Sequence, residues 1–446
     1  MTMNSGIRNT LFLCVALAVP MPRAMTQPAQ PAVGATLQPS AELNRALPKW
    51  LRFSGDYRAR LEGFEGGGFK LNNGDEYLLS RLRLNLQIKP MGWLRVFGQA
   101  QDSRVVWKNQ HPAAPPFQNT WDIRQAYVEI GNIEKQHFSI RTGRQELNIG
   151  DERLVGSSNW TNTARSFDAV RASMHYKGYR LDAFASSVVI ARDGQWDHRK
   201  DGNNLHGLVG GIEKLVPQAV IEPYLFWRLA PGQKTEAGKL AKLDSKTTGV
   251  RWVGKLRAHF DYNTDLAVQT GHLGTDRVRA WAGHANLGYT WAARFTPRMF
   301  AEYNYASGDK NPHDAKRGTF DQLYPTAHNM YGLADQVGWR NIIDLRTGVS
   351  IKPRQKWTAS GTFHSWWLAS IHDALYNAAG AAIARVANGA VGSHVGEELD
   401  GQAMYAVNKL VQVGVGFGHI FPGEFLKRAT PGKAYNFPFL MAGYTF

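Results

Sequence analysis

The stretch EYLLSRLRLNLQIKP, residues 76–90, carries two alternating series of side chains with different character. One series is aliphatic and consists of Leu78, Leu82, Leu84, Leu86 and Ile88. The other is cationic or polar and consists of Arg81, Arg83, Asn85, Gln87 and Lys89. Because successive side chains of a β-strand point to opposite faces, the stretch predicts a strand with one apolar and one cationic face.

The composition limits the kind of protein in which such a strand occurs. The chain has 446 residues and a formal net charge of +16, which fits nucleic acid, an anionic membrane surface or an acidic substrate as a partner. A mean hydropathy of −0.36 excludes a bundle of membrane helices.

The N-terminus predicts export from the cytoplasm. Arg8 precedes the apolar run TLFLCVALAV at 10–19, and PMPRA at 20–24 gives a plausible end near Ala24, so residues 1–24 are typical of a signal peptide. Residues 25–49 are rich in Pro and Ala and predict a flexible periplasmic lead-in. The single cysteine, Cys14, lies in the signal, so the mature chain has no disulfide.

Short alternating segments recur from residue 53 to the last residue and predict eighteen strands. They lie at 53–62, 76–88, 93–104, 121–130, 137–147, 165–176, 179–190, 205–214, 219–229, 246–256, 258–269, 280–291, 298–307, 339–351, 356–368, 398–407, 410–420 and 435–446.

The connections between these segments alternate in length. Short ones include 89–92, 132–136, 177–178, 216–219, 296–297, 352–355 and 408–409. Long ones include 105–120, 148–164, 191–204, 230–245, 308–338 and 369–397. An up-and-down barrel in the outer membrane has this rhythm, with short periplasmic turns and long extracellular loops.

The free-energy cost of placing a charge in lipid determines which face of each strand points to lipid and which points to the lumen. An arginine on the lipid face near the midplane costs roughly 2–4 kcal/mol, so the leucines of 76–88 are expected to face lipid and the arginines water inside a pore. Aromatic residues near strand ends predict the interfacial girdles: Trp93, Trp121, Trp160, Tyr176, Trp291, Trp366 and Trp367.

The predicted fold class is therefore all-β: residues 50–446 form a transmembrane up-and-down antiparallel barrel of about 18 strands. The expected location is the outer membrane of a Gram-negative-type cell, reached through the periplasm. Its lipid and lipopolysaccharide are the expected surroundings. The C-terminal PFLMAGYTF (438–446) resembles the signature of barrels delivered to the outer-membrane assembly machinery.

Several stretches together resemble the alginate-export family of outer-membrane barrels. They are SRLRLNL (80–86), IRQAYVEIG (123–131), RTGRQELNIGDERLVGSSNW (141–160), RSFDAVR (165–171), the segment 302–342 and VGEELD (395–400). The resemblance implies an eighteen-stranded barrel with an arginine-lined lumen that conducts an acidic polysaccharide. One feature departs from the family's characterised exporter: the turn at 408–409 is very short, where that protein has a long periplasmic turn covering the pore. This departure weakens alginate as the particular substrate and export as the direction.

Register and the family match together nominate arginines for the substrate path, because guanidinium groups pair bidentately with carboxylates. The candidates are Arg58, Arg60, Arg81, Arg83, Arg95, Arg124, Arg144, Arg165, Arg171, Arg251 and Arg346, with Glu62, Glu146 and Asp168 as orienting acids. The alternative interpretation is that these ion pairs only stabilise a polar barrel wall.

Other clusters point to no further chemistry. Asp309, Asp314 and Asp321 match no compact calcium loop, and charges in 151–156 and 307–321 are expected to be solvated. His364, His372 and His394 have no zinc spacing and are expected to pack at the membrane interface. We expect no enzyme activity, cofactor or metal, and no nucleic acid as partner. Any loop folded into the lumen is expected to come from 308–338 or 369–397.

The sequence thus predicts a passive outer-membrane channel for anionic solutes, most of all acidic, alginate-like polysaccharides or oligosaccharides. A general porin or uptake channel for small anionic metabolites is the main alternative. A barrel enzyme at the cell surface and an adhesive role for the long loops are the others.

Overall fold

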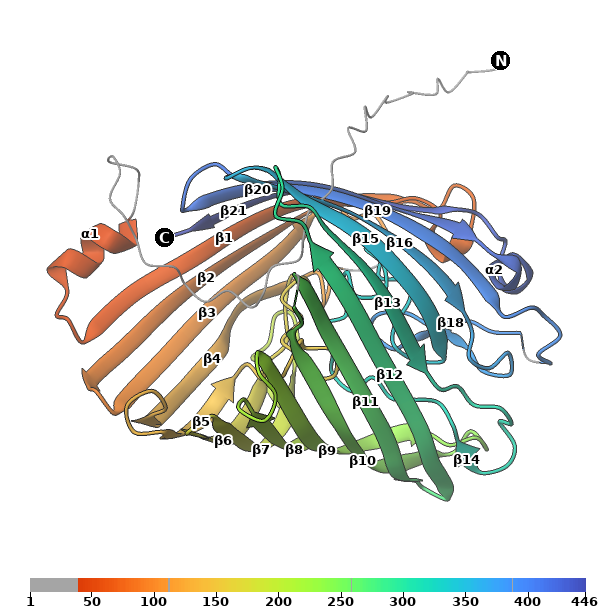
Figure 1. The fold of residues 1–446 in the computed structure, drawn as a ribbon, viewed down its shortest axis with the longest axis horizontal. Helices are drawn as coiled ribbons and strands as arrows, with labels where there is room; N and C mark the ends of the chain where they lie inside the picture. Colours follow the sequence, from red (N-terminus) through yellow and green to blue (C-terminus); the bar gives the residue numbers. More distant parts are fainter. Residues whose placement is uncertain (1–38, 111–112, 258, 387) are drawn as a thin grey trace, which may run out of the picture.

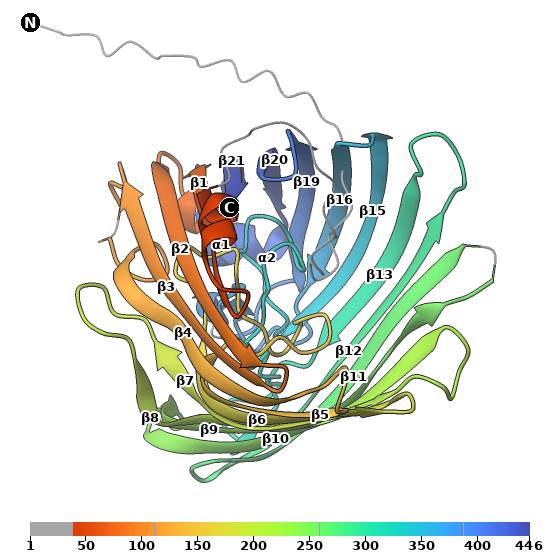
Figure 2. The same ribbon diagram turned by 90° about the vertical axis from the view of Figure 1, so that its left-hand side faces the viewer.

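A computed structural model describes residues 39–446 except 111, 112, 258 and 387. Within these residues, eighteen long antiparallel strands close into a barrel (Figures 1 and 2). The ring is complete because β1 pairs with β2 on one side and with β21, the last strand, on the other. The predicted fold class is confirmed.

The wall follows the chain order. Its strands are β1 (Leu51–Phe64), β2 (Asp75–Met91), β3 (Leu94–Val106), β4 (Asn119–Asn132), β5 (Phe138–Gln145), β6 (Phe167–Tyr176), β7 (Tyr179–Ile190), β8 (His198–Ile212), β9 (Ala219–Lys234), β10 (Leu240–Lys255), β11 (Phe260–Leu273), β12 (Asp276–Thr290), β13 (Arg298–Ala306), β15 (Ile342–Arg354), β16 (Trp357–Trp367), β19 (His394–Ala406), β20 (Val411–Pro422) and β21 (Tyr435–Thr445).

Each of the eighteen predicted segments overlaps one of these strands, but two predicted loops are wrong. The connection predicted at 230–245 is a tight hairpin, since β9 continues to Lys234 and β10 begins at Leu240. The connection predicted at 191–204 is shorter because β8 begins at His198. In both places the strands extend beyond the apolar belt, where polar residues replace the hydrophobic alternation that marks a membrane strand.

Smaller elements lie outside the wall. Helix α1 (Pro39–Ala46) lies within the predicted lead-in, and the Asn44 side chain holds it to β1 by bonding the backbone N–H and C=O of Phe53. The predicted signal peptide lies outside the described residues. In the described part of the chain, no helix has the length and apolar character needed to span a bilayer.

The two faces of the wall differ as the charge argument requires. On β2, Arg81 and Arg83 are 6% and 7% exposed, whereas Leu86 is 43% exposed. The arginines therefore point into the barrel and the leucines point outward. Among the predicted girdle residues, Trp93, Trp121, Tyr176 and Trp291 are exposed on the outside.

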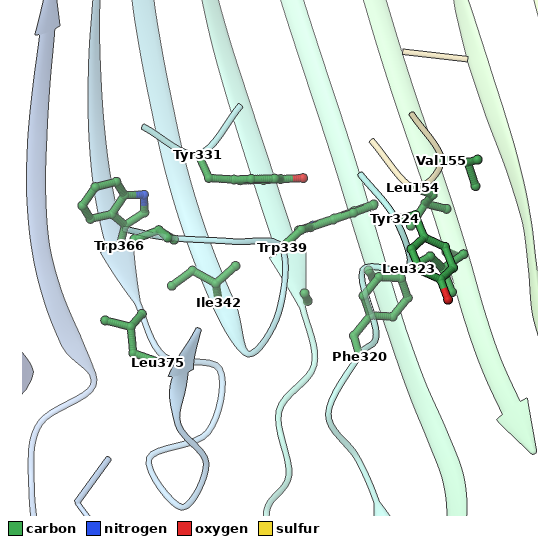
Figure 3. Packing of buried hydrophobic residues seen from close by; sticks show 14 of the residues in the cluster. Leu154, Val155, Phe320, Leu323, Tyr324, Tyr331, Trp339, Ile342, Trp366 and Leu375 are labelled. Carbon is green, nitrogen blue, oxygen red and sulfur yellow. The ribbon is translucent and has the colours of Figure 1, made fainter. Parts of the chain in front are cut away.

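The barrel interior is not empty at its loop end. Loops 146–166, 307–341 and 368–393, together called the inner loops, fold inward (Figure 2). Their apolar side chains and those of the wall form one buried cluster, which includes Leu154, Val155, Phe320, Trp339 and Leu375 (Figure 3). Three short strands lie in these loops: β14 (Lys316–Arg317), β17 (Leu375–Tyr376) and β18 (Ala382–Ala384).

This interior packing corrects two expectations. Inward folding of the other two inner loops matches the expectation, but loop 146–166 also enters the lumen, which was not predicted. Trp160 and Trp366 are not girdle residues, since Trp366 is fully buried (Figure 3) and Trp160 packs against the interior cluster. Helix α2 (Glu424–Ala429), between β20 and β21, adds Phe425 and Leu426 to the same cluster.

Candidate functional site

Five inward-facing arginines lie together on the inner wall and form what we call the arginine cluster: Arg58 and Arg60 on β1, Arg81 and Arg83 on β2, and Arg124 on β4. The register sets Arg58 directly opposite Arg81 and Arg83 opposite Asp56. Like charges at directly opposite positions destabilise a sheet, so these guanidinium groups require acceptors from elsewhere.

The tip of loop 146–166 supplies those acceptors. The backbone carbonyl oxygens from Asn159 to Thr161 accept N–H groups at 2.7–3.4 Å from Arg58, Arg60 and Arg81. The side-chain oxygen of Asn159 accepts two further bonds, from Arg83 at 2.9 Å and from Arg124 at 3.3 Å. The loop tip therefore caps all five guanidinium groups with neutral oxygens.

The ring of Trp160 fixes the tip in place. The guanidinium carbon of Arg60 lies 3.7 Å from the centre of this ring, a close cation–π contact. On the other side, the imidazole of His328 from loop 307–341 stacks on Trp160 at 3.8 Å with an interplanar angle of 4°. Two inner loops thus meet over the arginine cluster.

Carboxylates neutralise only part of the cluster. Glu62 forms an ion pair with Arg60, Glu146 pairs with Arg124 at 2.5 Å, and Asp56 lies 3.8 Å from Arg81. Five guanidinium groups therefore face three carboxylates, which leaves an excess of two positive charges. Burial alone would raise the pKa of the Glu146 carboxyl, but Arg124 and Arg83 outweigh it and lower that pKa below its ordinary value.

Five of the other six candidate arginines contact the inner loops or the inner wall. Arg165 donates to the carbonyl oxygens of Gly156, Tyr324 and Pro325, so it joins two inner loops. Four others pair with carboxylates on the inner wall: Arg95 with Glu129 at 3.7 Å, Arg171 with Asp182 at 2.8 Å, Arg251 with Glu222 at 2.5 Å, and Arg346 with Glu302 at 3.3 Å.

Arg144 and Asp168 do not face the lumen, which corrects their prediction. They form a two-bond ion pair, and the register sets them opposite each other. Asp168 alternates with Phe167, which is buried inside, and shares its face with Val170, which is 52% exposed to the outside. Strict alternation from the inward-facing Arg141 also places Arg144 on the outer face.

A carboxylate pair beside Arg144 makes one loop sensitive to pH. Asp197, in the connection between β7 and β8, contacts Asp122 of β4 and accepts a bond from Asn119 at 2.9 Å. Burial raises the pKa of Asp197 to about 6, and the Asp122 charge adds to this shift.

A raised folded-state pKa for an acid means that its contribution to stability increases as the pH falls. We therefore expect the 191–197 connection to open less often at pH 5 than at pH 7.5. Hydrogen exchange of its amides, measured at both pH values and corrected for the intrinsic pH dependence of exchange, gives the opening equilibrium. Asp122→Asn should reduce the difference, because it removes the part of the pKa shift that the Asp122 charge adds to the effect of burial. An opening equilibrium that is the same at both pH values contradicts the expectation.

The sequence did not identify Arg153 as a residue of the barrel interior. Charges in 151–156 were predicted to be solvated, but Arg153 is 4% exposed and donates to Tyr331 at 2.7 Å and to Asn304 at 3.1 Å. Burial opposes ionisation of Asp151, but the charge of Arg153 outweighs it and lowers the pKa of Asp151 to about 2. These charges anchor loop 146–166 inside the barrel.

An acidic strip on β16 and β19, separated from β1 by only β20 and β21, holds loop 307–341. Glu398 and Asp400 on β19 accept the backbone N–H groups of Ala334 at 2.8 Å and Leu333 at 3.3 Å. His364 belongs to this strip, since its Nδ1 lies 3.0 Å from Asp344 and the side chain is fully buried. Its predicted position at the membrane interface is therefore wrong. In the described chain, no group of three or more potential ligands is arranged to hold a metal ion.

Comparison with known proteins identifies the family to which this barrel belongs. The alginate export family model matches residues 49–438, which covers most of the chain. The chain belongs to the alginate-export family. No match was found among curated proteins.

Solved structures similar to this member of the alginate-export family come from Pseudomonas aeruginosa. OccK3 (OpdO) has a TM-score of 0.58 and 11% identity, with 88% of this chain and 95% of that one covered. OpdK, crystallised with vanillate, has a TM-score of 0.59 and 8% identity, with 88% and 98% covered. OpdQ has a TM-score of 0.58 and 11% identity, with 89% and 97% covered. The fold is shared, and family and fold together support an outer-membrane channel.

Proposed function

We propose that this alginate-export family member is a passive channel for anionic solutes, with acidic oligosaccharides or polysaccharides as its preferred substrates, and that the arginine cluster selects them. The observation that carries the proposal is the excess of guanidinium groups held by neutral carbonyls. A cluster needed only to stabilise the wall has no use for uncompensated charge, whereas a site for carboxylates requires it.

The loop tip then acts as an internal competitor of the substrate. Carbonyl oxygens accept guanidinium N–H bonds without neutralising the charge, whereas a carboxylate can accept two parallel N–H bonds and also neutralise the charge. In addition, the Nε atoms of Arg58, Arg81 and Arg124 are buried and have no acceptor among the described residues. Arriving carboxylates therefore gain more from these arginines than the loop does.

A polymer fits this arrangement better than a single anion. A uronate chain carries one carboxylate per sugar, so successive units meet successive arginines of the cluster as the chain advances. Sites along a channel must also release their ligand. The cluster contains three carboxylates, which keep its affinity for each substrate carboxylate moderate: Asp56, Glu62 and Glu146. Passage requires that the loop tip move off the cluster, so substrate and loop exchange places on the same donors.

A second candidate is a channel for small carboxylates. The structurally similar OpdK was crystallised with vanillate, an aromatic monocarboxylate. Four of the candidate arginines, Arg95, Arg171, Arg251 and Arg346, already pair with carboxylates, so a small anion entering this barrel has the arginine cluster as its main site.

Single-channel conductance separates the two candidates. The purified protein is placed in planar bilayers and exposed to a uronate oligomer, to a neutral oligosaccharide of equal length, and to vanillate. We expect concentration-dependent current blockades with the uronate oligomer and none with the neutral one. Blockade by vanillate at lower concentration than by the oligomer favours the small-carboxylate channel. Equal blockade by charged and neutral oligomers contradicts both.

A further inference from the structure

The outer face of the wall carries an exposed basic patch that the channel function does not explain. We propose that this patch binds the phosphate groups of lipopolysaccharide in the outer leaflet. The residues of this lateral patch are Lys246 on β10, His272 on β11, Arg277 and Arg279 on β12, and Lys316 on β14. The inference is independent of the proposed function, because these side chains point away from the lumen.

Strand register brings the lateral patch together from distant parts of the chain. Lys246 and Arg279 are both paired with Thr270, one on each side of β11. One row nearer the loops, His272 is paired with Arg277, and Arg277 is paired with Lys316 of β14. The patch is therefore two adjacent rows of mainly basic residues across neighbouring strands, in which the acidic residue Asp244 is paired with His272.

All five side chains are exposed, and alternation shows that they face outward. Gln269 and Val278, on the opposite face of the same strands, are 1% and 4% exposed and lie inside the barrel. The side chains of Arg277 and Arg279 form no hydrogen bond or ion pair with any described residue, unlike the capped arginines of the lumen. Two guanidinium groups at consecutive outward positions of β12 are thus available to a ligand.

Nearby acids neutralise little of this charge. Asp244 accepts the indole N–H of Trp227 at 2.8 Å, and Asp314 holds Lys316 at 3.0 Å. The lateral patch keeps an excess of positive charge beside Arg277 and Arg279.

The depth of the lateral patch fits a lipid headgroup. One row toward the membrane, Val268 and Trp281 are paired across β11 and β12 and are 55% and 49% exposed. Tryptophan marks the boundary between hydrocarbon and headgroups, and arginine is tolerated on the lipid face only near that boundary. The cations therefore lie at headgroup level on the loop side, where the outer leaflet ends.

Phosphate on a membrane-anchored glycolipid matches these features. Guanidinium groups bind phosphate through two parallel N–H bonds, and two arginines one row apart can hold separate phosphates of one headgroup. The acyl chains of the same molecule then lie along Val268 and Leu266, which is 59% exposed. A soluble phosphate compound gains nothing from those apolar neighbours.

Native mass spectrometry tests the assignment on the purified full-length protein in detergent. Probes are bisphosphorylated lipid A, its dephosphorylated form, and phosphatidylglycerol. We expect the native protein to retain lipid A at least tenfold better than dephosphorylated lipid A, and R277E/R279E to lose that preference. The matched control K352E/R354E makes the same charge change at two exposed positions near the opposite end of the barrel and should bind lipid A like the native protein.

Folding and the lipid source are checked in the same experiment. Unchanged single-channel conductance and heat-modifiable gel migration show that R277E/R279E is folded. If that variant is folded and retains lipid A like the native protein, the site is wrong. Equal retention of phosphatidylglycerol and lipid A by the native protein rejects lipopolysaccharide as the ligand.

Discussion

Replacing Arg81 and Arg83 together by glutamate is expected to change the proposed anion selectivity of the channel to cation selectivity. The arginine cluster would then hold three guanidinium groups and five carboxylates, so its excess changes from two positive to two negative charges. A unit charge about 4 Å from a passing ion contributes about 1 kcal/mol even at the dielectric constant of water. Because about 1.4 kcal/mol is a factor of ten, we expect the permeability ratio to shift by tenfold or more.

The reversal potential in a salt gradient measures this ratio. The control R277E/R279E makes the same change in total charge at two consecutive outward positions and should leave the reversal potential unchanged in phospholipid bilayers without lipopolysaccharide. The variant R81Q/R83Q removes the charge but keeps N–H donors for Asn159, so an intermediate shift is expected. A reversal potential equal to that of the native channel would remove these two residues from the ion path.

Trp160→Ala is expected to release the loop tip and raise the open fraction of the channel. The variant loses the cation–π contact with Arg60, about 0.5–2 kcal/mol, and the stacking on His328, about 0.5–1.5 kcal/mol. A loss of about 1–3 kcal/mol corresponds to a 5–150-fold shift between closed and open states. The carbonyl bonds from Asn159 and Thr161 remain possible, so the loop should become mobile without unfolding the barrel.

The release of the loop tip is measured as an increase in open probability in single-channel records. Trp160→Phe keeps an aromatic face for Arg60 and His328 and should behave nearly like the native protein. Trp121→Ala removes an exposed tryptophan of the outer girdle, 50% accessible, and serves as the control for general loss of aromatic area. If Trp160→Ala and the native channel have the same open probability and the same blockade by uronate oligomers, the loop tip does not close the channel.

The strands of the barrel wall could be predicted from the sequence because each membrane strand is specified by the alternation of its own residues. Alternation of Leu82 and Leu84 with Arg81 and Arg83 specifies both the strand and its orientation, since one face meets hydrocarbon and the other water. The same logic failed where strands leave the membrane. Around Pro231 and Gly232 the extended part of β9 has no apolar face, so it was predicted to be a loop.

The arrangement inside the barrel could not be predicted in the same way. Arg81 finds its acceptor in Asn159, which is 78 residues away, and no alternation or spacing links the two. Arg153 looked like a solvated loop charge, yet it reaches Tyr331, 178 residues away. Such contacts arise from how the inner loops pack together, which is a property of the whole barrel.

One signal in the sequence pointed to the loop tip. A loop that stays in water has little reason to carry Leu154, Val155 and Trp160 within a few residues, whereas a loop buried in a lumen needs apolar side chains to pack. Their presence in a connection predicted to be extracellular was therefore evidence against full solvent exposure. Trp160 was instead attributed to the girdle, because aromatic residues at strand ends usually lie there.

The pairing of β1 with β21 has a consequence for biosynthesis. Residues 439–445 complete the ring against 56–62, so β1 lacks its closing partner until β21 has been synthesised. In hydrocarbon, an open strand edge leaves backbone groups without partners at a cost of several kcal/mol each. A nonsense mutation before β21 should therefore leave β1 with an open edge and prevent formation of a closed pore, even a smaller one.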